Sequence, residues 1–422
     1  MNRNGTFPFQ KFYAKEKITM PDFLMKIISF VLGIITSISM SMTSLTTLIN
    51  KSNFEVASSF DQVVYEDQLV PQKDTDGNWT FYTDRDLKVL QFTDVHIGGG
   101  IMSLKKDKKA LNAVAAMVTA EKPDLVVLTG DNVYPVPFQA GTFNNGISTD
   151  MVITLLEKLG VYYTVCFGNH DSELYSDYSR EQIADKYANP DLKYSLFQKG
   201  PEDVDGFGNQ VIKVKNSKGI VTNAFFVLDS HDYTDGDLLG IQWKYDNIHE
   251  NQIAWYKENV LAIDKANKAI DPDYPMFPSL CFFHIPLEEY GIAWQEYKAN
   301  GYKDTENVKC FGGGFYEKDE KSYCGIHPDN FFETVLELGS TKGIFCGHDH
   351  ENNASVEYKG VRLTYGMSVD YLAYIGIDKK GAQRGCTVIT LSKDGKLSVS
   401  LENYYQDKYV SKYEKEKVSI DR

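Results

Sequence analysis

The chain has 422 residues, of which 42% are hydrophobic and 24% are charged. This composition is that of a folded globular protein and excludes disordered, collagen-like and low-complexity chains. Lysine and arginine together number 44 against 58 aspartates and glutamates, so the formal net charge is −14. Because binding to a phosphate backbone requires a basic surface, this charge argues against nucleic acid as a partner.

The N-terminal 50 residues have the pattern of an export segment. Basic residues outnumber acidic residues over positions 1–26, and positions 27–50 carry no charge. An apolar core at 27–35 is followed by a stretch rich in serine and threonine. Two interpretations stay open: a cleaved secretory signal peptide and a single membrane anchor. Both predict a secreted or membrane-anchored, extracytoplasmic protein.

The rest of the chain is predicted to form one domain with a segment on either side. We assign 51–85 to a lead-in segment, 86–403 to the domain and 404–422 to a charged C-terminal tail that frays. Six cysteines are too few for a disulfide scaffold. Cys310 and Cys324 flank one loop. In an exported protein they either close this loop as a disulfide or stay free.

Five continuous apolar runs predict strands that are covered on both faces. In chain order they read LKVLQF, LVVLTG, VYYTVCFG, MFPSLCFF and KGIFC. Amphipathic segments at 103–121, 148–160, 250–267 and 328–340 predict helices, so strand and helix alternate as in βαβ units. Alternating segments at 209–230, 354–368 and 386–403 predict hairpins, and the region 231–330 is otherwise irregular.

Each of the five apolar runs ends in side chains that bind metal ions. The carboxyl ends of strands in open α/β sheets meet at one edge, so we expect these side chains to converge. Imidazole, carboxylate and amide oxygen are ligands suited to Zn, Fe or Mn. The candidate ligands are Asp94, His96, Asp131, Asn169, His284, His348 and His350.

Seven candidate ligands exceed the three or four that one ion takes, which predicts two ions that share a carboxylate. Because residues i and i+2 of a strand point to the same face, Asp94 is expected to pair with His96, and His348 with His350. Two adjacent ions are a known device for in-line displacement at phosphorus.

The series DxH, GDN, GNHD, H and GHDH resembles the calcineurin-like metallophosphoesterase superfamily over residues 88–401. Within that superfamily, GDNVY, GNHD and HIP are similar to the purple acid phosphatase-like branch. The resemblance implies a mixed α/β fold, the four-layer αββα sandwich of two β-sheets flanked by helices. It also implies that Asp94, His96, Asp131 and His350 surround a first metal, and that Asp131, Asn169, His284 and His348 surround a second.

The resemblance further implies that His170 faces the substrate and is not a ligand. Asp171 either orients His170 or caps a helix, and His231 either reaches the substrate or is a loop residue. The first motif departs from purple acid phosphatases, which have DxG there and a tyrosine ligand. With His96 in the first motif, Tyr134 is predicted not to be a ligand, so a purple iron(III) centre is not expected.

These residues predict a metal-dependent phosphoric ester hydrolase with two ions of Fe, Mn or Zn. In the expected mechanism a metal-bridging hydroxide attacks phosphorus in line, and His170 either stabilises the developing charge or protonates the leaving group. A phosphomonoesterase is favoured. A phosphodiesterase or nucleotidase would use the same metal core, and an exported binding protein with structural metals is the alternative from another class. The expected partner is a phosphate-ester substrate, contacted by Asn169, His170 and His231; the oligomeric state is undefined.

Overall fold

The structure is a computed structural model that describes residues 33, 50–234, 237, 240–374, 376–377, 384–393 and 395–418. The signal or anchor predicted at 1–50 lies outside these residues, except for Gly33 and Asn50, and stays a prediction. Among the described helices, none has the length and apolar character that a membrane span requires.

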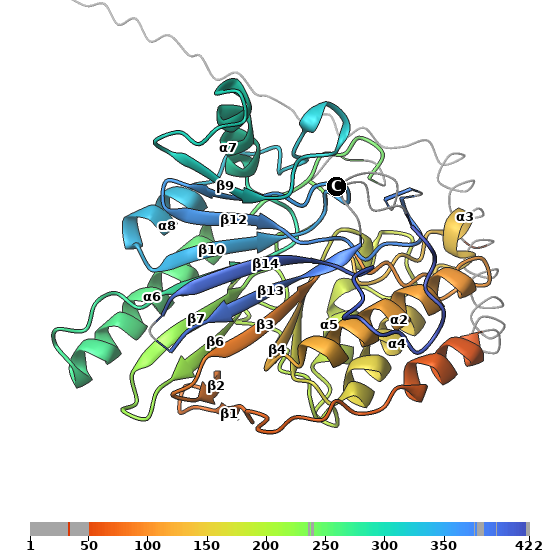
Figure 1. The fold of residues 1–422 in the computed structure, drawn as a ribbon, viewed down its shortest axis with the longest axis horizontal. Coiled ribbons are helices and arrows are strands. Elements are labelled where there is room, and N and C mark those ends of the chain that lie inside the picture. Colours follow the sequence, from red (N-terminus) through yellow and green to blue (C-terminus); the bar gives the residue numbers. More distant parts are fainter. Residues whose placement is uncertain are drawn as a thin grey trace, which may run out of the picture.

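Two β-sheets pack against each other in the centre of the molecule, with helices on their outer faces (Figure 1). The larger sheet has parallel strands at its centre and hairpins beside them. In spatial order its strands are β1 (Gln72–Lys73), β2 (Trp79–Tyr82), β6 (Gln210–Lys215), β7 (Val221–Val227), β8 (Ser279–Phe282), β10 (Thr341–Cys346), β12 (Val361–Tyr365), β11 (Ser355–Tyr358) and β9 (Val308–Gly312).

The smaller sheet joins three parallel strands to an antiparallel hairpin. In spatial order its strands are β14 (Leu397–Asn403), β13 (Gly385–Leu391), β3 (Leu87–Phe92), β4 (Leu125–Thr129) and β5 (Tyr163–Cys166).

Each sheet has its own helical layer (Figure 1). The smaller sheet is covered by α2 (Leu104–Glu121), α4 (Asn145–Leu159) and α5 (Arg180–Tyr187), and the larger by α6 (Glu250–Ile270), α7 (Glu288–Ala299) and α8 (Phe331–Leu338). The other helical pieces are residues 50–59, α3 (Pro137–Ala140), η1 (His170–Ser172) and η2 (Lys318–Glu320).

Alternation along β7 shows why the strands are apolar on both faces. Phe225 packs in the core between the sheets, where it meets Phe282 of β8 edge to face. Its neighbour Phe226 points to the other side and packs on Tyr256 of α6. Both phenylalanines are fully buried. The predicted αββα sandwich is therefore confirmed, because successive side chains of a strand serve two different cores.

All five predicted strands, the four helices and the three hairpins are present, with ends shifted by a few residues. Within 231–330, α7 and β9 were not predicted. The start of α7 gives a weak signal because Leu287 offers no capping side chain and Gly291 lies in the first turn. Alternate residues of β9 are exposed, so this short edge strand lacks an apolar run.

The prediction that the C-terminal tail frays is wrong for residues 404–418. Tyr404 and Tyr409 are fully buried, and the Tyr409 hydroxyl donates to Glu121 of α2 over 2.7 Å. This segment is rich in charged residues, but its two buried tyrosines pack against the helical layer that contains α2. Cys310 and Cys324 are free thiols, so the loop-closing disulfide is not formed.

We predict that Tyr409→Ala lowers the free energy of unfolding by about 3–5 kcal/mol, because it empties a fully buried aromatic site. The matched control is Val410→Ala, since Val410 is 81% exposed; its effect should stay within about 0.5 kcal/mol. Urea denaturation of both variants measures the difference. Equal stability of the two would show that the tail does not pack on α2.

Candidate metal centre

The site lies where strands of the two sheets end next to each other. Backbone N–H of Asp94, just beyond β3, donates to the carbonyl of Gly130 beyond β4 over 3.1 Å, and Gly347 N–H, beyond β10, donates to His284 C=O over 3.0 Å. Thr93 forms an isolated bridge with Ser368, which joins the ends of the two sheets. The expected convergence therefore occurs, but two sheets supply it instead of one.

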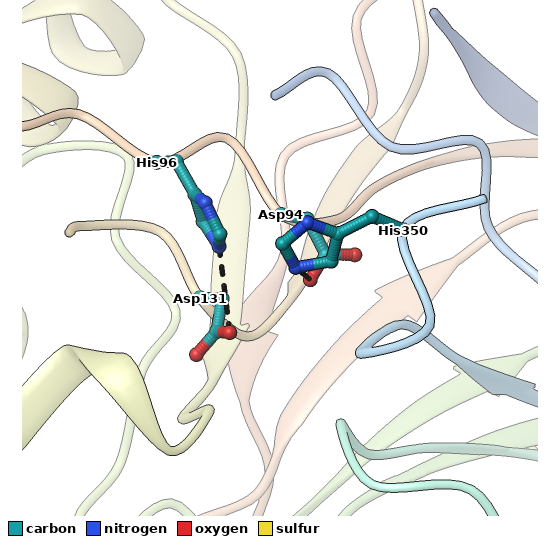
Figure 2. Close-up of side chains that lie close together, drawn as sticks. All are labelled: Asp94, His96, Asp131 and His350. Carbon is teal, nitrogen blue, oxygen red and sulfur yellow. Dashed lines mark hydrogen bonds and ion pairs between the residues drawn. The ribbon is translucent and has the colours of Figure 1, made fainter. Parts of the chain in front are cut away.

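The first group of converging side chains is Asp94, His96, Asp131 and His350, which are all buried (Figure 2). Their nitrogen and carboxylate oxygen atoms lie within 4.8 Å of one another. His96 Nε2 is 3.4 Å from Asp131 Oδ2, and His350 Nε2 is 3.4 Å from Asp94 Oδ1. Such a spacing leaves room for one metal ion among four ligand atoms.

The second group is Asp131, His284 and His348, also buried and also within 4.8 Å. His284 Nε2 lies 3.3 Å from Asp131 Oδ2 and 3.3 Å from His348 Nδ1. Asp131 thus belongs to both groups, as a shared carboxylate must.

The pairing of His348 with His350 by strand alternation is wrong, since the two residues fall in different groups. The motif lies beyond the end of β10, and His348 has a φ of +75°. Asp94, His96 and Asp131 also have positive φ. Non-glycine residues are rarely left-handed, so the backbone is bent at four of the candidate ligands and the i, i+2 rule does not apply.

Two glycines allow these bent segments to approach one another. A side chain at Gly168 would collide with the carboxylate of Asp131, and one at Gly347 would collide with Thr93 and Asp94. Both residues precede a candidate ligand in the GNHD and GHDH motifs. Close approach therefore explains these glycines.

The hydrogen bond of His284 Nδ1 determines which ring nitrogen is free to bind a metal. His284 Nδ1 lies 2.9 Å from the Thr129 carbonyl, which can only accept, so this nitrogen carries the proton. In a neutral ring the lone pair of Nε2 then faces Asp131 Oδ2 and His348 Nδ1. A buried carboxylate beside these rings needs a positive charge, which a proton on a ring or a bound cation supplies.

Asp370 is a site residue that the sequence did not reveal. One of its carboxylate oxygens lies 3.4 Å from His96 Nδ1 and the other lies 3.4 Å from His350 Nδ1. It is fully buried, and its oxygens accept hydrogen bonds from the backbone of residues 372–374. A carboxylate behind a histidine fixes the tautomer and directs the other ring nitrogen to the metal. Asp370 is placed to do this for two rings at once, with one oxygen facing each ring.

The same charges shift the pKa values in the site. Burial opposes a charged ring, but Asp370 and Asp131 outweigh it and raise the pKa of His96 to about 10. Burial also opposes charge on His284, yet Asp131 raises its pKa to about 9. Burial alone would raise the pKa of Asp131; the neighbouring histidines, first His284, hold it well below its usual value. The site therefore stabilises positive charge strongly.

Asn169 supplies a further acceptor. Its Nδ2 donates to the Tyr233 hydroxyl over 2.9 Å, while its buried Oδ1 has no hydrogen-bond partner among the described residues. An orphaned buried oxygen is costly unless a ligand satisfies it. The residues present thus fit two metal ions, with donor types suited to Zn, Fe or Mn.

His170 lies beside this cluster and is oriented by Glu173. The His170 backbone N–H donates to Asp131 Oδ1 over 2.8 Å, and its Nδ1 lies 2.7 Å from Glu173 Oε1. Asp171 does not orient His170: its carboxylate instead accepts from Gly168 N–H over 2.7 Å and from Val133 N–H over 3.1 Å. The reason is the helical turn η1, which places i and i+3 on one side.

His231 does not reach the cavity above the cluster. Its ring stacks on His249 with centroids 4.0 Å apart, and its Nε2 lies 2.9 Å from Gln252 Oε1. The prediction that His231 contacts substrate is therefore not supported. The hydroxyl of Tyr134 donates to Gln139 over 2.8 Å, and the ring stacks on His96, as expected for a tyrosine that is not a ligand.

A cavity of about 330 Å³ opens above the cluster, and Asp131, His170, His348 and His350 form part of its lining. His170 is only partly buried, with 23% of its side chain exposed. It can therefore meet a molecule held in the cavity, whereas the ligand residues lie beneath it. This size is typical of pockets for small molecules.

A sequence model of the family described as calcineurin-like phosphoesterase matches residues 87–352. The protein belongs to this calcineurin-like phosphoesterase family. All seven candidate ligands, Asn169 among them, lie within the matched segment, whereas Asp370 lies beyond it.

The relatives include proteins named for the purple acid phosphatases, as the sequence predicted. The chain is 30% identical to "Probable inactive purple acid phosphatase 14" of Arabidopsis thaliana, over 70% of this chain and 73% of the relative. It is 26% identical to "Phosphatase DCR2" of Saccharomyces cerevisiae, over 63% of this chain and 44% of the relative. A dimetal phosphatase from Danio rerio superposes with a TM-score of 0.45 at 13% identity, covering 72% of this chain and 92% of that chain.

We predict that Asp370→Asn weakens metal binding by about 10–100-fold, because the single amide oxygen can accept a hydrogen bond from only one of the two rings. Asp74→Asn is the matched control, since Asp74 pairs with Lys213 over 2.9 Å, away from the cluster. Competition with a fluorescent chelator measures the zinc affinity of both variants. Wild-type affinity in Asp370→Asn would contradict the role of Asp370.

Proposed function

We propose that the protein is a dinuclear-metal phosphoesterase that hydrolyses phosphomonoesters. One observation carries the proposal: two groups of buried acceptors share Asp131 at the floor of an open cavity. The family membership supports hydrolysis of phosphate esters as the class of reaction.

The residues that would hold the ions are those of the two groups together with Asn169. Asp94, His96 and His350 would hold one ion, His284, His348 and Asn169 would hold the other, and Asp131 would contact both. When bound, such ions acidify water and neutralise phosphate oxygens. The protein contributes the fixed positions of the ligands, which Asp370 maintains for two of them.

The protein's own acid is His170. Its Nδ1 is engaged by Glu173, so its other nitrogen, Nε2, is available to give a proton to the leaving oxygen. Tyr233 donates to Glu173 over 3.2 Å and supports the same carboxylate. Tyrosine rings pack on three of the histidines: Tyr134 on His96, Tyr245 on His348 and Tyr374 on His350. These rings limit the access of water to the ligands.

The word "inactive" in the name of the plant relative concerns that protein. Activity of the present chain is supported by its residues, since all seven predicted ligands converge or offer a free acceptor. The position of Tyr134 supports a centre without a tyrosine ligand, which distinguishes it from a purple iron(III) site.

Hydrolysis of p-nitrophenyl phosphate and of its bis-ester, with Mn, Zn or Fe added to the purified protein, tests the proposal. We predict faster turnover of the monoester, loss of activity with a chelator, and loss of both metal and activity in Asp131→Ala. Faster turnover of the bis-ester would indicate a phosphodiesterase. A metal-loaded protein that cleaves neither ester would be a binding protein with structural metals.

We further predict that His170→Ala keeps its metal content but slows turnover by about 10²–10⁴-fold, the range for loss of a general acid. Glu173→Gln should give a smaller loss in the same direction. Both losses should be larger for an alkyl ester than for a p-nitrophenyl ester, whose leaving group needs no proton. An equal loss on the two esters would argue that His170 only positions the substrate.

A further inference from the structure

The wall of the cavity is unusually aromatic. Seven of the seventeen lining residues are tyrosine or tryptophan, whereas aromatic residues are 13% of the whole chain. Tyr134, Tyr245 and Tyr374 pack on ligand histidines, and Tyr233 holds Asn169 and Glu173. The contacts of these four explain their presence, but they leave Tyr175, Trp243 and Tyr323 to be explained.

Trp243 stands out among these three. It lines the cavity, yet it is 65% exposed. It also has a φ of +54°, a left-handed conformation that a bulky side chain rarely adopts. An exposed indole in a strained backbone gains little from folding, so packing does not account for its position.

The segment around Trp243 is held in place over the metal centre. Thr234 N–H donates to the Lys244 carbonyl over 2.9 Å. Tyr233 and Tyr245 form an isolated β-bridge, and their stacked rings have centroids 5.6 Å apart. Gly240 lies so close to the Tyr233 ring that any side chain there would collide with it. The ring centroids of Tyr245 and His348 lie 4.2 Å apart. The turn that carries Trp243 is therefore in contact with a candidate metal ligand.

We propose that the cavity selects phosphate esters whose leaving group carries a planar ring, and that Trp243 stacks on this ring. The inference rests on the proposed function, because it concerns the ester group of a phosphate bound over the cluster. The same cavity is lined by the cluster residues and by Trp243, so the ester group of a phosphate held over the cluster would lie in the space that Trp243 lines. Stacking between a planar ring and an aromatic side chain changes affinity by about 5- to 100-fold.

The test compares two substrates with the same reacting bond. Adenosine 5′-monophosphate and ribose 5-phosphate both release a primary alkoxide, and only the first carries a planar ring. The metal-loaded protein is expected to prefer adenosine 5′-monophosphate by at least about fivefold in kcat/KM. In Trp243→Ala this preference should fall towards one, and Trp243→Phe should restore most of it. Tyr82→Ala, at a residue 49% exposed on β2, is the matched control and should keep the preference.

A second readout does not depend on turnover. Isothermal titration calorimetry with adenosine should show saturable binding to the wild type and weaker binding to Trp243→Ala, whereas ribose should bind to neither. Equal kcat/KM for the two phosphates with no adenosine binding would overturn the ring proposal, while activity on p-nitrophenyl phosphate would keep the proposed function. Adenosine binding without hydrolysis of any ester would support ring recognition and refute the phosphoesterase.

Discussion

The structure depends on one electrostatic constraint: carboxylates and histidine rings from distant parts of the chain are buried face to face. Asp131 Oδ2 has His96 Nε2 at 3.4 Å and His284 Nε2 at 3.3 Å. The outer nitrogen of His284 is bonded to a backbone carbonyl and that of His96 faces the Asp370 carboxylate, so the inner nitrogens of both rings are directed at Asp131. Buried groups of this kind are unfavourable without a compensating positive charge. The fold, the bent backbone and the chemistry all follow from that arrangement.

The fold explains how such an arrangement can be held. Strands β3, β4 and β5 of one sheet and β8 and β10 of the other carry fully buried side chains between rigid layers. The ligands follow these strands directly, at positions where four of them adopt positive φ. Each such residue costs about 1–3 kcal/mol, which only a well-packed surrounding structure can offset. Packing in the two cores thus offsets the unfavourable free energy of the bent backbone at the site.

Much of the fold and of the candidate site was predictable from sequence, because polar motifs directly after apolar strands are a strong local signal. The layer arrangement came from the family resemblance, and the strand and helix positions came from periodicity. The sequence does not indicate Asp370, because this residue lies just beyond the predicted hairpin at 354–368 and follows no apolar run of the kind that marks the other motifs. The second strand of that hairpin, β12, nevertheless runs parallel to β10, so its carboxyl end also faces the site. Glu173 was missed in favour of Asp171 because the turn η1, which decides between them, leaves no mark in the sequence.

The central claim is that two ions share Asp131, and anomalous diffraction from crystals of the metal-loaded protein tests it most directly. The account predicts two peaks, one among Asp94, His96 and His350 and one among Asn169, His284 and His348, with Asp131 in contact with both. A single peak, or two peaks without Asp131 between them, would contradict it.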